Sequence, residues 1–415
     1  MEHALAASEE ELLHSLDFKL SPSSSYVIQR TSSSFFPTGS STFSPTGVSV
    51  ARVQLSSESF LDPESIRIQF TVNNLDPMLG VAFKTGPWGF WSRIRLLCGG
   101  TLLEDVFYAN RINEMLTQSL QPTNSAANEY AEGFNLSGNG LEVIDSAQSF
   151  TVNFKPYCLG ILHCRKMWPA FAAGGGLTLE LYLADAVECT LNTAQWTLSN
   201  LQVQCDTLLL DSALENSYRR MLLEGKTLSI GYSTFNTVLQ SIAAGTSNVA
   251  IPIVRAATRI RGVLLSFGQG SNDPTVFAHP DRVANLARSV QNPPRLRDST
   301  VQLMVALGAK RFPIKPIDSA SFFFENLRKL MNVYSTTLGG LNIAPVAYIT
   351  TRFIMGVSME RVVGQWGSGV SSRQGDLIYA QFTGIPAAST CDRCWVTVIN
   401  DQIAELSAAG CTVFD

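Results

Sequence analysis

The residues of this chain that could bind a metal or carry out thiol chemistry are few and scattered. His163 lies beside Cys164, Cys158 lies five positions before His163, and Cys391 and Cys394 form a Cys-x-x-Cys pair. A closed zinc site needs four ligands, and two matched pairs at tight spacing are its usual sequence signal. Only one regular pair is present, so we interpret these residues as ordinary thiols and expect no metal and no other cofactor. The sequence leaves a redox or metal role for Cys391 and Cys394 open.

The other patterns that suggest catalysis or nucleotide binding are incomplete. Gly225-Lys226-Thr227 matches the end of a phosphate-binding loop, but Arg220 stands where that motif needs its first glycine, so we interpret the triplet as a turn. Glu104 and Asp105 are adjacent, whereas a glycosidase pair must face across a cleft, and we expect both on a solvated face. The Gly-x-Ser-x-Gly elbow of serine hydrolases does not occur. The sequence therefore predicts no catalytic residue and a protein that is not an enzyme.

The chain carries little charge. Of its 415 residues, 45% are hydrophobic and 15% are charged, against the ~25% charged residues usual in globular proteins. Because desolvating charges is costly, charged residues are depleted at interface cores, and this composition favours a protein that is covered by partners. A net charge of −4 without a run of Lys or Arg argues against direct nucleic-acid binding, which needs many phosphate contacts. Several of the eight cysteines fall within apolar patterns, which indicates free thiols and synthesis in a reducing compartment.

A pattern of strand, glycine turn and helix occurs twice in the chain. The repeated segments are Ile94–Leu97, Gly99-Gly100 and Phe107–Leu116 in the first half, and Val301–Val305, Gly308 and Phe322–Met331 in the second half. The turn glycines Gly99 and Gly308 are 209 residues apart (308 − 99). Trp196 and Trp395, each of which opens a strand pattern, are 199 residues apart (395 − 196). The repeat predicts two similar β-rich domains.

Most of the remaining chain alternates apolar and polar residues with a period of two, which is typical of half-buried strands. Residues 1–16 have the pattern of a short helix, with a frayed tail as the open alternative, and residues 21–47, rich in Ser, Pro and Gly, are expected to be extended. Apolar residues at helical spacing between Leu208 and Leu222 predict a helix that joins the halves. We therefore expect an N-terminal helix and extended arm (1–47), a first β domain (48–205), a connector (206–225) and a second β domain (226–415).

The repeated turn-helix units, the two tryptophan strands and the connector resemble those of double jelly-roll major capsid proteins. These proteins build the shells of tailless icosahedral double-stranded DNA viruses of the tectivirus, adenovirus, virophage and polinton-like lineage. The resemblance covers most of the chain, residues 45–405. It implies an all-β fold of two tandem eight-stranded jelly-roll sandwiches with short helical insertions.

The resemblance also implies a structural function. Three copies would form a pseudo-hexagonal homotrimeric capsomer of an icosahedral viral capsid, found in the virion after synthesis in the host cytoplasm or nucleus. The implied partners are neighbouring capsomers, penton and minor capsid proteins and, in viruses that have one, an internal membrane, without direct nucleic-acid binding. Apolar side chains near the N-terminus are expected at the subunit interface, namely Leu5, Leu12, Leu16, Phe35 and Phe36.

Two other interpretations remain open at this point. The chain could be a two-domain jelly-roll binding module, such as a lectin, an adhesin or a spike. It could also be an enzyme on a duplicated cupin-like sandwich, although such sites hold a metal with several His, and only four His are scattered through this chain.

Overall fold

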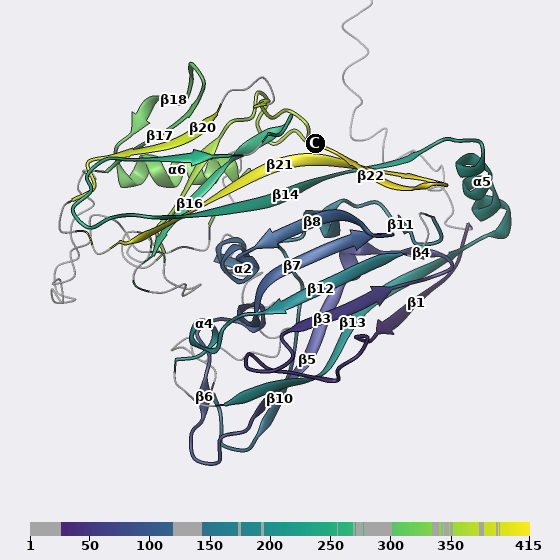
Figure 1. Ribbon diagram of the computed structural model, residues 1–415. Coiled ribbons are helices and arrows are strands. Elements are labelled where there is room, and N and C mark those ends of the chain that lie inside the picture. The colour runs from purple at the N-terminus through teal and green to yellow at the C-terminus, as the bar shows by residue number, and fades with distance from the viewer. Residues whose placement is uncertain are drawn as a thin grey trace, which may run out of the picture.

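The computed structural model describes residues 26–118, 143–172, 176–191, 195–254, 256–268, 270, 277, 301–333, 340–341, 343, 348, 352–372, 377–386, 389 and 391–415. They form two β-sandwiches joined by a helix, α5 (Ser212–Leu223), at one end of the molecule (Figure 1). None of the helices in this part of the chain is both long and apolar enough to cross a lipid bilayer.

The first sandwich consists of two facing sheets. Its eight principal strands are β1 (Val27–Phe35), β3 (Val50–Leu55), β5 (Arg67–Asn74), β7 (Trp91–Cys98), β8 (Thr101–Phe107), β10 (Ser149–Phe154), β12 (Leu177–Leu183) and β13 (Trp196–Leu210). One sheet has the order β1-β13-β5-β10, and the other has the order β3-β12-β7-β8. The shorter elements are β2 (Thr42–Phe43), β4 (Phe60–Leu61), β6 (Val81–Ala82), β9 (Val143–Ile144), β11 (Trp168–Pro169), the 3-10 helices η1 (Pro63–Ser65), η2 (Pro87–Phe90) and η3 (Gly160–His163), and the helices α2 (Ala109–Gln118) and α4 (Ala186–Cys189).

The second sandwich repeats this arrangement. Its strands are β14 (Leu228–Ser241), β15 (Val249–Ile253), β16 (Ile260–Gly268), β17 (Gln302–Leu307), β18 (Lys310–Ile317), β19 (Ile354–Ser358), β20 (Ile378–Thr383), β21 (Arg393–Ser407) and β22 (Gly410–Phe414), with helix α6 (Ala320–Leu330). The sheets have the orders β14-β21-β16-β19 and β15-β20-β17-β18. Strand β22 pairs with the C-terminal end of β21, residues Ile403–Ser407.

The two sandwiches have the same topology. When the principal strands of each half are numbered one to eight along the chain, both halves give the sheet orders 1-8-3-6 and 2-7-4-5. This is the order of a jelly roll, in which the chain folds back on itself as two interlocked Greek keys. The prediction of an all-β chain with two tandem eight-stranded jelly rolls is confirmed.

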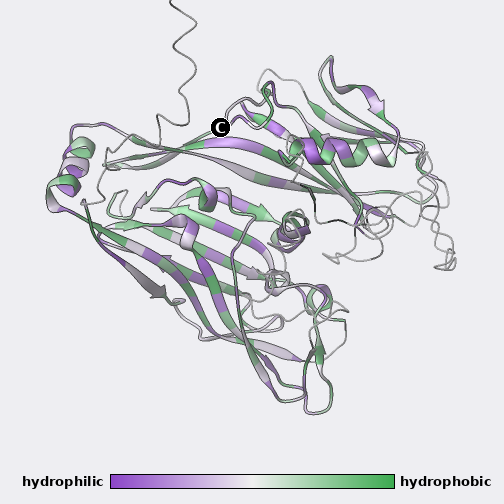
Figure 2. Ribbon diagram, turned by 180° about the vertical axis from the view of Figure 1, so that it is seen from behind, coloured by the Kyte–Doolittle hydropathy of each residue, from purple (hydrophilic) through white to green (hydrophobic). Residues whose placement is uncertain are grey.

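Period-two alternation produces these strands. In β3, Ala51, Val53 and Leu55 are buried between the sheets, while the residues between them face outward. Apolar and polar positions alternate in this way along many strands of both halves (Figure 2). The buried apolar side chains of the two jelly rolls form one continuous cluster, so the halves share a core where they meet.

Each repeated unit contains a strand that the sequence pattern did not reveal. After Gly99-Gly100 and after Gly308 the chain forms β8 and β18, and the helices α2 and α6 begin only after these strands. The prediction of a helix from Phe107 was therefore wrong at its start, because Phe107 is the last residue of β8. Strand β18 was not predicted because it contains Pro313 and Pro316, which are rare within strands. The prolines are tolerated because β18 lies at a sheet edge.

Two further segments differ from the sequence interpretation. Within residues 21–47, predicted to be an extended entry, β1 pairs antiparallel with β13 and so forms the first strand of the first jelly roll. Leu208, assigned to a helix by its spacing, belongs to β13 because it pairs with Phe60 of β4. Helix α5 begins only after Asp211, whose carboxylate accepts a hydrogen bond of 2.8 Å from the Ala213 N–H.

Candidate functional site at the junction of the two jelly rolls

The surfaces of the two jelly rolls meet along a junction that brings distant parts of the chain together. The first jelly roll contributes β8, α2 and η3, and the second contributes β14, β16, β21 and β22 (Figure 1). Hydrogen bonds that cross the junction include Tyr232 Oη to the Leu103 carbonyl (2.9 Å), Thr101 Oγ1 to the Cys411 carbonyl (3.0 Å) and Lys166 Nζ to the Ser229 carbonyl (3.0 Å). These contacts fix the position of one jelly roll relative to the other.

Arg111 extends from α2 into the second jelly roll. Its side chain is only 2% exposed, and its guanidinium carbon lies 3.8 Å from the centroid of the Trp395 ring and 4.5 Å from that of Phe277. Arg111 Nε donates to Ser266 Oγ at 3.1 Å, and Nη2 donates to the Phe267 carbonyl at 3.2 Å. The planar guanidinium can stack on aromatic faces while it donates from its edge, which a lysine cannot do. Arg111 therefore holds α2 against β16 and β21.

At Gly160, the first residue of η3, the backbones of the two halves approach each other closely. A Cβ atom built on Gly160 would lie 1.5 Å from the Ser233 carbonyl oxygen, a backbone atom of β14. Only a residue without a side chain allows η3 to reach β14 at this distance.

Glu104 is buried in the junction, so the expectation that it lies on a solvated face was wrong. Its carboxylate accepts hydrogen bonds from the backbone N–H groups of Gly160 (3.0 Å) and Ile161 (2.8 Å) and from the Thr234 hydroxyl. Burial raises the pKa of Glu104 to about 7, and the hydrogen bonds offset only part of that effect. Its neighbour Asp105 faces the other side of β8, where it binds Arg93 at 2.6 Å.

The raised pKa of Glu104 makes the stability of the protein depend on pH. The folded chain holds the Glu104 proton more tightly than the unfolded chain, whose pKa is near 4.5, so this stabilising contribution is complete below 4.5 and is lost as the pH rises through about 7. Compared with Glu104→Gln, the wild type should lose on the order of 2 kcal/mol of unfolding free energy between pH 5 and pH 8. Urea unfolding of both proteins at several pH values measures this difference. All other titrating groups are common to both proteins, so parallel pH profiles would show that Glu104 does not titrate differently on folding.

The residues considered for a metal site lie in two separate places. His163 and Cys164 line a cleft of about 420 Å³ beside Ser233 of β14. Ser233 pairs with Asp401 of β21, and Cys394 lies seven residues before Asp401 on that strand (401 − 394), roughly 23 Å away at ~3.3 Å per residue. The two groups therefore cannot share one ion.

The other two cysteines of that set are buried thiols. The N–H of Cys158 donates to Asn113 Oδ1 at 3.0 Å, and burial raises the thiol pKa of Cys158, while Cys391 lies just before β21. Within the part of the chain that the structure describes, no three His, Cys, Asp or Glu side chains gather in a way that could hold a metal ion.

The Gly225-Lys226-Thr227 triplet forms the turn that ends α5. Gly225 has a φ of +80°, and Lys226 Nζ lies 3.3 Å from the Glu224 carboxylate. A phosphate-binding loop must precede a helix so that the helix N-terminus faces the phosphate, whereas here the helix precedes the loop. The interpretation of this triplet as a turn is confirmed.

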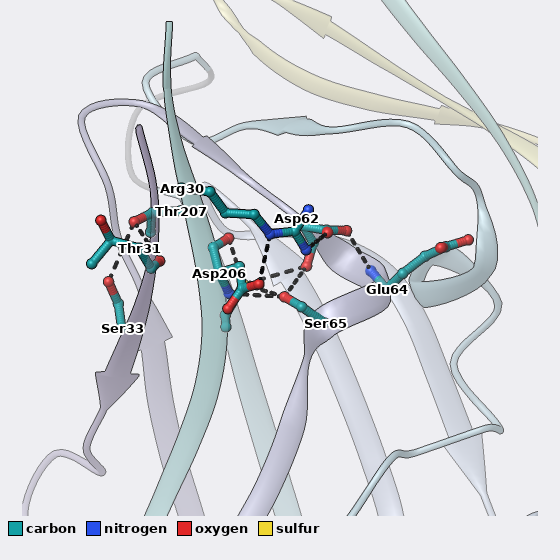
Figure 3. A network of polar contacts seen from close by, with 9 residues as sticks. Arg30, Thr31, Ser33, Asp62, Glu64, Ser65, Asp206 and Thr207 are labelled. Carbon is teal, nitrogen blue, oxygen red and sulfur yellow. Dashed lines mark hydrogen bonds and ion pairs between the residues drawn. The ribbon is translucent and has the colours of Figure 1, made fainter. Parts of the chain in front are cut away.

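Away from the junction, a network of polar side chains holds β1 on the first jelly roll (Figure 3). Arg30 on β1 donates from Nε to Asp206 Oδ2 of β13 at 2.8 Å and forms an ion pair with Asp62. Asp62 also accepts from the Glu64 N–H at 3.1 Å, which starts η1, and the Ser65 hydroxyl accepts from the Asp206 N–H at 2.8 Å. The network thus ties β1, η1 and β13 together at the strand end nearest α5.

The structure describes two of the five residues predicted at a subunit interface. Leu5, Leu12 and Leu16 lie outside the described residues. Phe35, at the end of β1, is partly buried and packs against the core, whereas the next residue, Phe36, is 64% exposed. Of this set, Phe36 is therefore the described residue that a neighbouring subunit could cover.

Comparison with known proteins gives matches of structure only. No protein-family model matches the chain, and no curated protein matches it in sequence. The solved structures that match it include VP54 of the virus PBCV-1 fitted into a cryo-EM reconstruction of the virophage Sputnik (11% identity, 95% of this chain, 98% of that chain, TM-score 0.65), the Faustovirus major capsid protein (9%, 96%, 94%, 0.59) and the cryo-EM structure of the virophage Sputnik (12%, 99%, 92%, 0.58).

These matches run over both halves and the connector together. Their TM-scores of 0.58 to 0.65 show that the arrangement of strands is shared, whereas sequence identities of 9% to 12% show that few residues are the same. The strand orders derived above agree with that assignment, because each half has the complete jelly-roll topology. This chain therefore has the double jelly-roll fold of viral major capsid proteins.

Proposed function

We propose that this chain is a structural protein, the major capsid protein of an icosahedral virus. One observation carries the proposal: a single eight-strand topology occurs twice in a chain that capsid-protein structures match almost from end to end. Two similar sandwiches side by side give each chain two similar outer sides. Three chains then provide six sides, so a homotrimer can occupy a pseudo-hexagonal place in a shell.

The composition supports an assembled state. A charged fraction of 15% limits the cost of burying the outer faces of the jelly rolls against neighbours. Large apolar side chains also remain exposed on the single chain, among them Phe36, Met78, Leu223 and Ile314. Interfaces between subunits would cover such residues.

The finer assignments follow from the same proposal. The partners are two further copies of this chain, neighbouring capsomers, penton and minor capsid proteins and, in a virus that has one, an internal membrane. The protein would reside in the virion after synthesis in the host cytoplasm or nucleus and would not bind nucleic acid directly. Leu5, Leu12, Leu16, Phe35 and Phe36 are proposed to contact a neighbouring subunit.

Light scattering coupled to size-exclusion chromatography tests the trimer directly. The expected mass is 135.6 kDa, three times the 45.2 kDa of one chain, and it should persist on dilution. A monomer of 45.2 kDa that binds a ligand on a glycan array would instead support a lectin, adhesin or spike.

A further inference from the structure

Two cysteines from opposite jelly rolls meet where two hairpins touch across the junction. Cys98 ends β7 and lies opposite Thr101 in the β7–β8 hairpin, while Cys411 lies opposite Leu406 in the β21–β22 hairpin. The Thr101 hydroxyl donates a 3.0 Å hydrogen bond to the Cys411 carbonyl, so the two hairpin ends are held together. Cys98 is 0% exposed and Cys411 is 7% exposed.

The two thiols influence each other's pKa, and they do so in opposite directions. The Cys98 side chain lowers the pKa of Cys411, and the Cys411 side chain raises that of Cys98. Burial instead raises the pKa of other thiols, such as Cys158, Cys205 and Cys394. Cys411 is thus the more acidic of the two thiols, and it keeps the small exposure to solvent that a reagent needs.

We propose that Cys98 and Cys411 form a disulfide that joins the two jelly rolls covalently when the protein meets hydrogen peroxide. The Cys411 thiolate attacks a peroxide oxygen, an S–O bond forms as the O–O bond breaks, and hydroxide leaves to become water on protonation. The Cys98 sulfur then attacks the Cys411 sulfur, the S–S bond forms, and the hydroxyl leaves with the Cys98 proton as a second water. Two thiols and one hydrogen peroxide thus give one disulfide and two waters.

The bridge would act on the junction itself. It closes a chain segment of 313 residues (411 − 98), and a long closed loop restricts the unfolded chain strongly in the chain-entropy account of disulfides. It would also keep the β7–β8 hairpin against β22 if the other junction contacts opened. The inference concerns the single folded chain and holds whether or not the chain assembles into a shell.

Oxidation of the purified full-length protein tests the proposal. The reduced protein is treated with hydrogen peroxide at low molar excess and quenched, and free thiols are counted after denaturation. The count should fall from eight to six, the oxidised chain should migrate faster on a non-reducing gel, and peptide mapping should find Cys98 joined to Cys411. The midpoint of urea unfolding should rise on oxidation and return on reduction.

Single-cysteine variants provide the controls. Cys98→Ser and Cys411→Ser should each keep their seven thiols and show no mobility change, whereas Cys205→Ser, which removes another buried strand cysteine, should fall from seven to five. Eight unreacted thiols in the folded wild type would overturn the proposal. So would a mapped bridge elsewhere, either between Cys391 and Cys394 or between two chains, and peptide mapping of the wild type decides this even if a variant fails to fold.

Discussion

Replacing Gly160 with alanine is expected to prevent the two jelly rolls from packing against each other as they do in the native chain. The new Cβ would lie 1.5 Å from the Ser233 carbonyl oxygen and 2.6 Å from its carbonyl carbon. These are backbone atoms of β14, which pairs with β21 over its whole length and cannot move aside as a flexible side chain can. The loss of unfolding free energy should therefore exceed the ~1–3 kcal/mol of ordinary overpacking.

Gly340→Ala is the matched control for this change. Among the residues that the structure describes, a Cβ on Gly340 meets no atom within 4 Å, and Gly340 does not have the positive φ that would strain an alanine. Urea unfolding followed by tryptophan fluorescence should show a large loss of stability, or no soluble protein, for Gly160→Ala and a change within about 0.5 kcal/mol for the control. A Gly160→Ala protein with the wild-type midpoint would mean that η3 does not approach β14 in solution.

The second large effect is expected at Arg111. Arg111→Met removes the donor to Ser266 Oγ and to the Phe267 carbonyl and leaves both acceptors buried, at about 1–3 kcal/mol for each unsatisfied group. It also removes a desolvated cation from the face of Trp395, worth about 2 kcal/mol. Because these terms are not additive, we expect a total loss of about 3–5 kcal/mol, similar to breaking a buried ion pair.

The control for Arg111 is an arginine on the connector helix. The Arg220 side chain is 82% exposed and forms an ion pair with Glu224, the residue that follows α5, so Arg220→Met should cost less than about 0.5 kcal/mol. Arg111→Lys should lie between the two, because lysine keeps the charge but lacks the planar fork. Equal unfolding free energies for Arg111→Met and Arg220→Met would contradict the assignment of Arg111 to the junction.

The sequence predicted the features of the fold that depend on local pattern. Strands β12 and β15 begin and end at the residues where the alternation does, and the repeated glycine turns marked the two corresponding hairpins. Their partner strands were missed for local reasons as well. Two prolines interrupt β18, and the charged pair Glu104 and Asp105 in β8 is unusual for a strand next to the core.

The junction could not be predicted because it depends on contacts between distant residues. Arg111 lies beside Asn110 and Asn113 on α2, and a polar run of this kind would ordinarily face solvent. All three are buried: Arg111 because it extends into the second jelly roll, which begins more than 100 residues later, and Asn113 because it hydrogen-bonds to Cys158 inside the first. Glu104 was misplaced for the same reason. One signal was present in the sequence, a glycine at position 160 among apolar residues, but a glycine alone does not indicate which strand approaches it.

The protein content of purified particles shows whether this chain builds an icosahedral shell, as we propose. Virus particles from the source of this chain would be purified by density gradient, and their proteins quantified by mass spectrometry against labelled peptides. We predict that this chain is the most abundant protein of the particle and exceeds every other component in copy number. Particles in which the chain is absent, or present only in the few copies expected of a spike or an attachment protein, would contradict the claim.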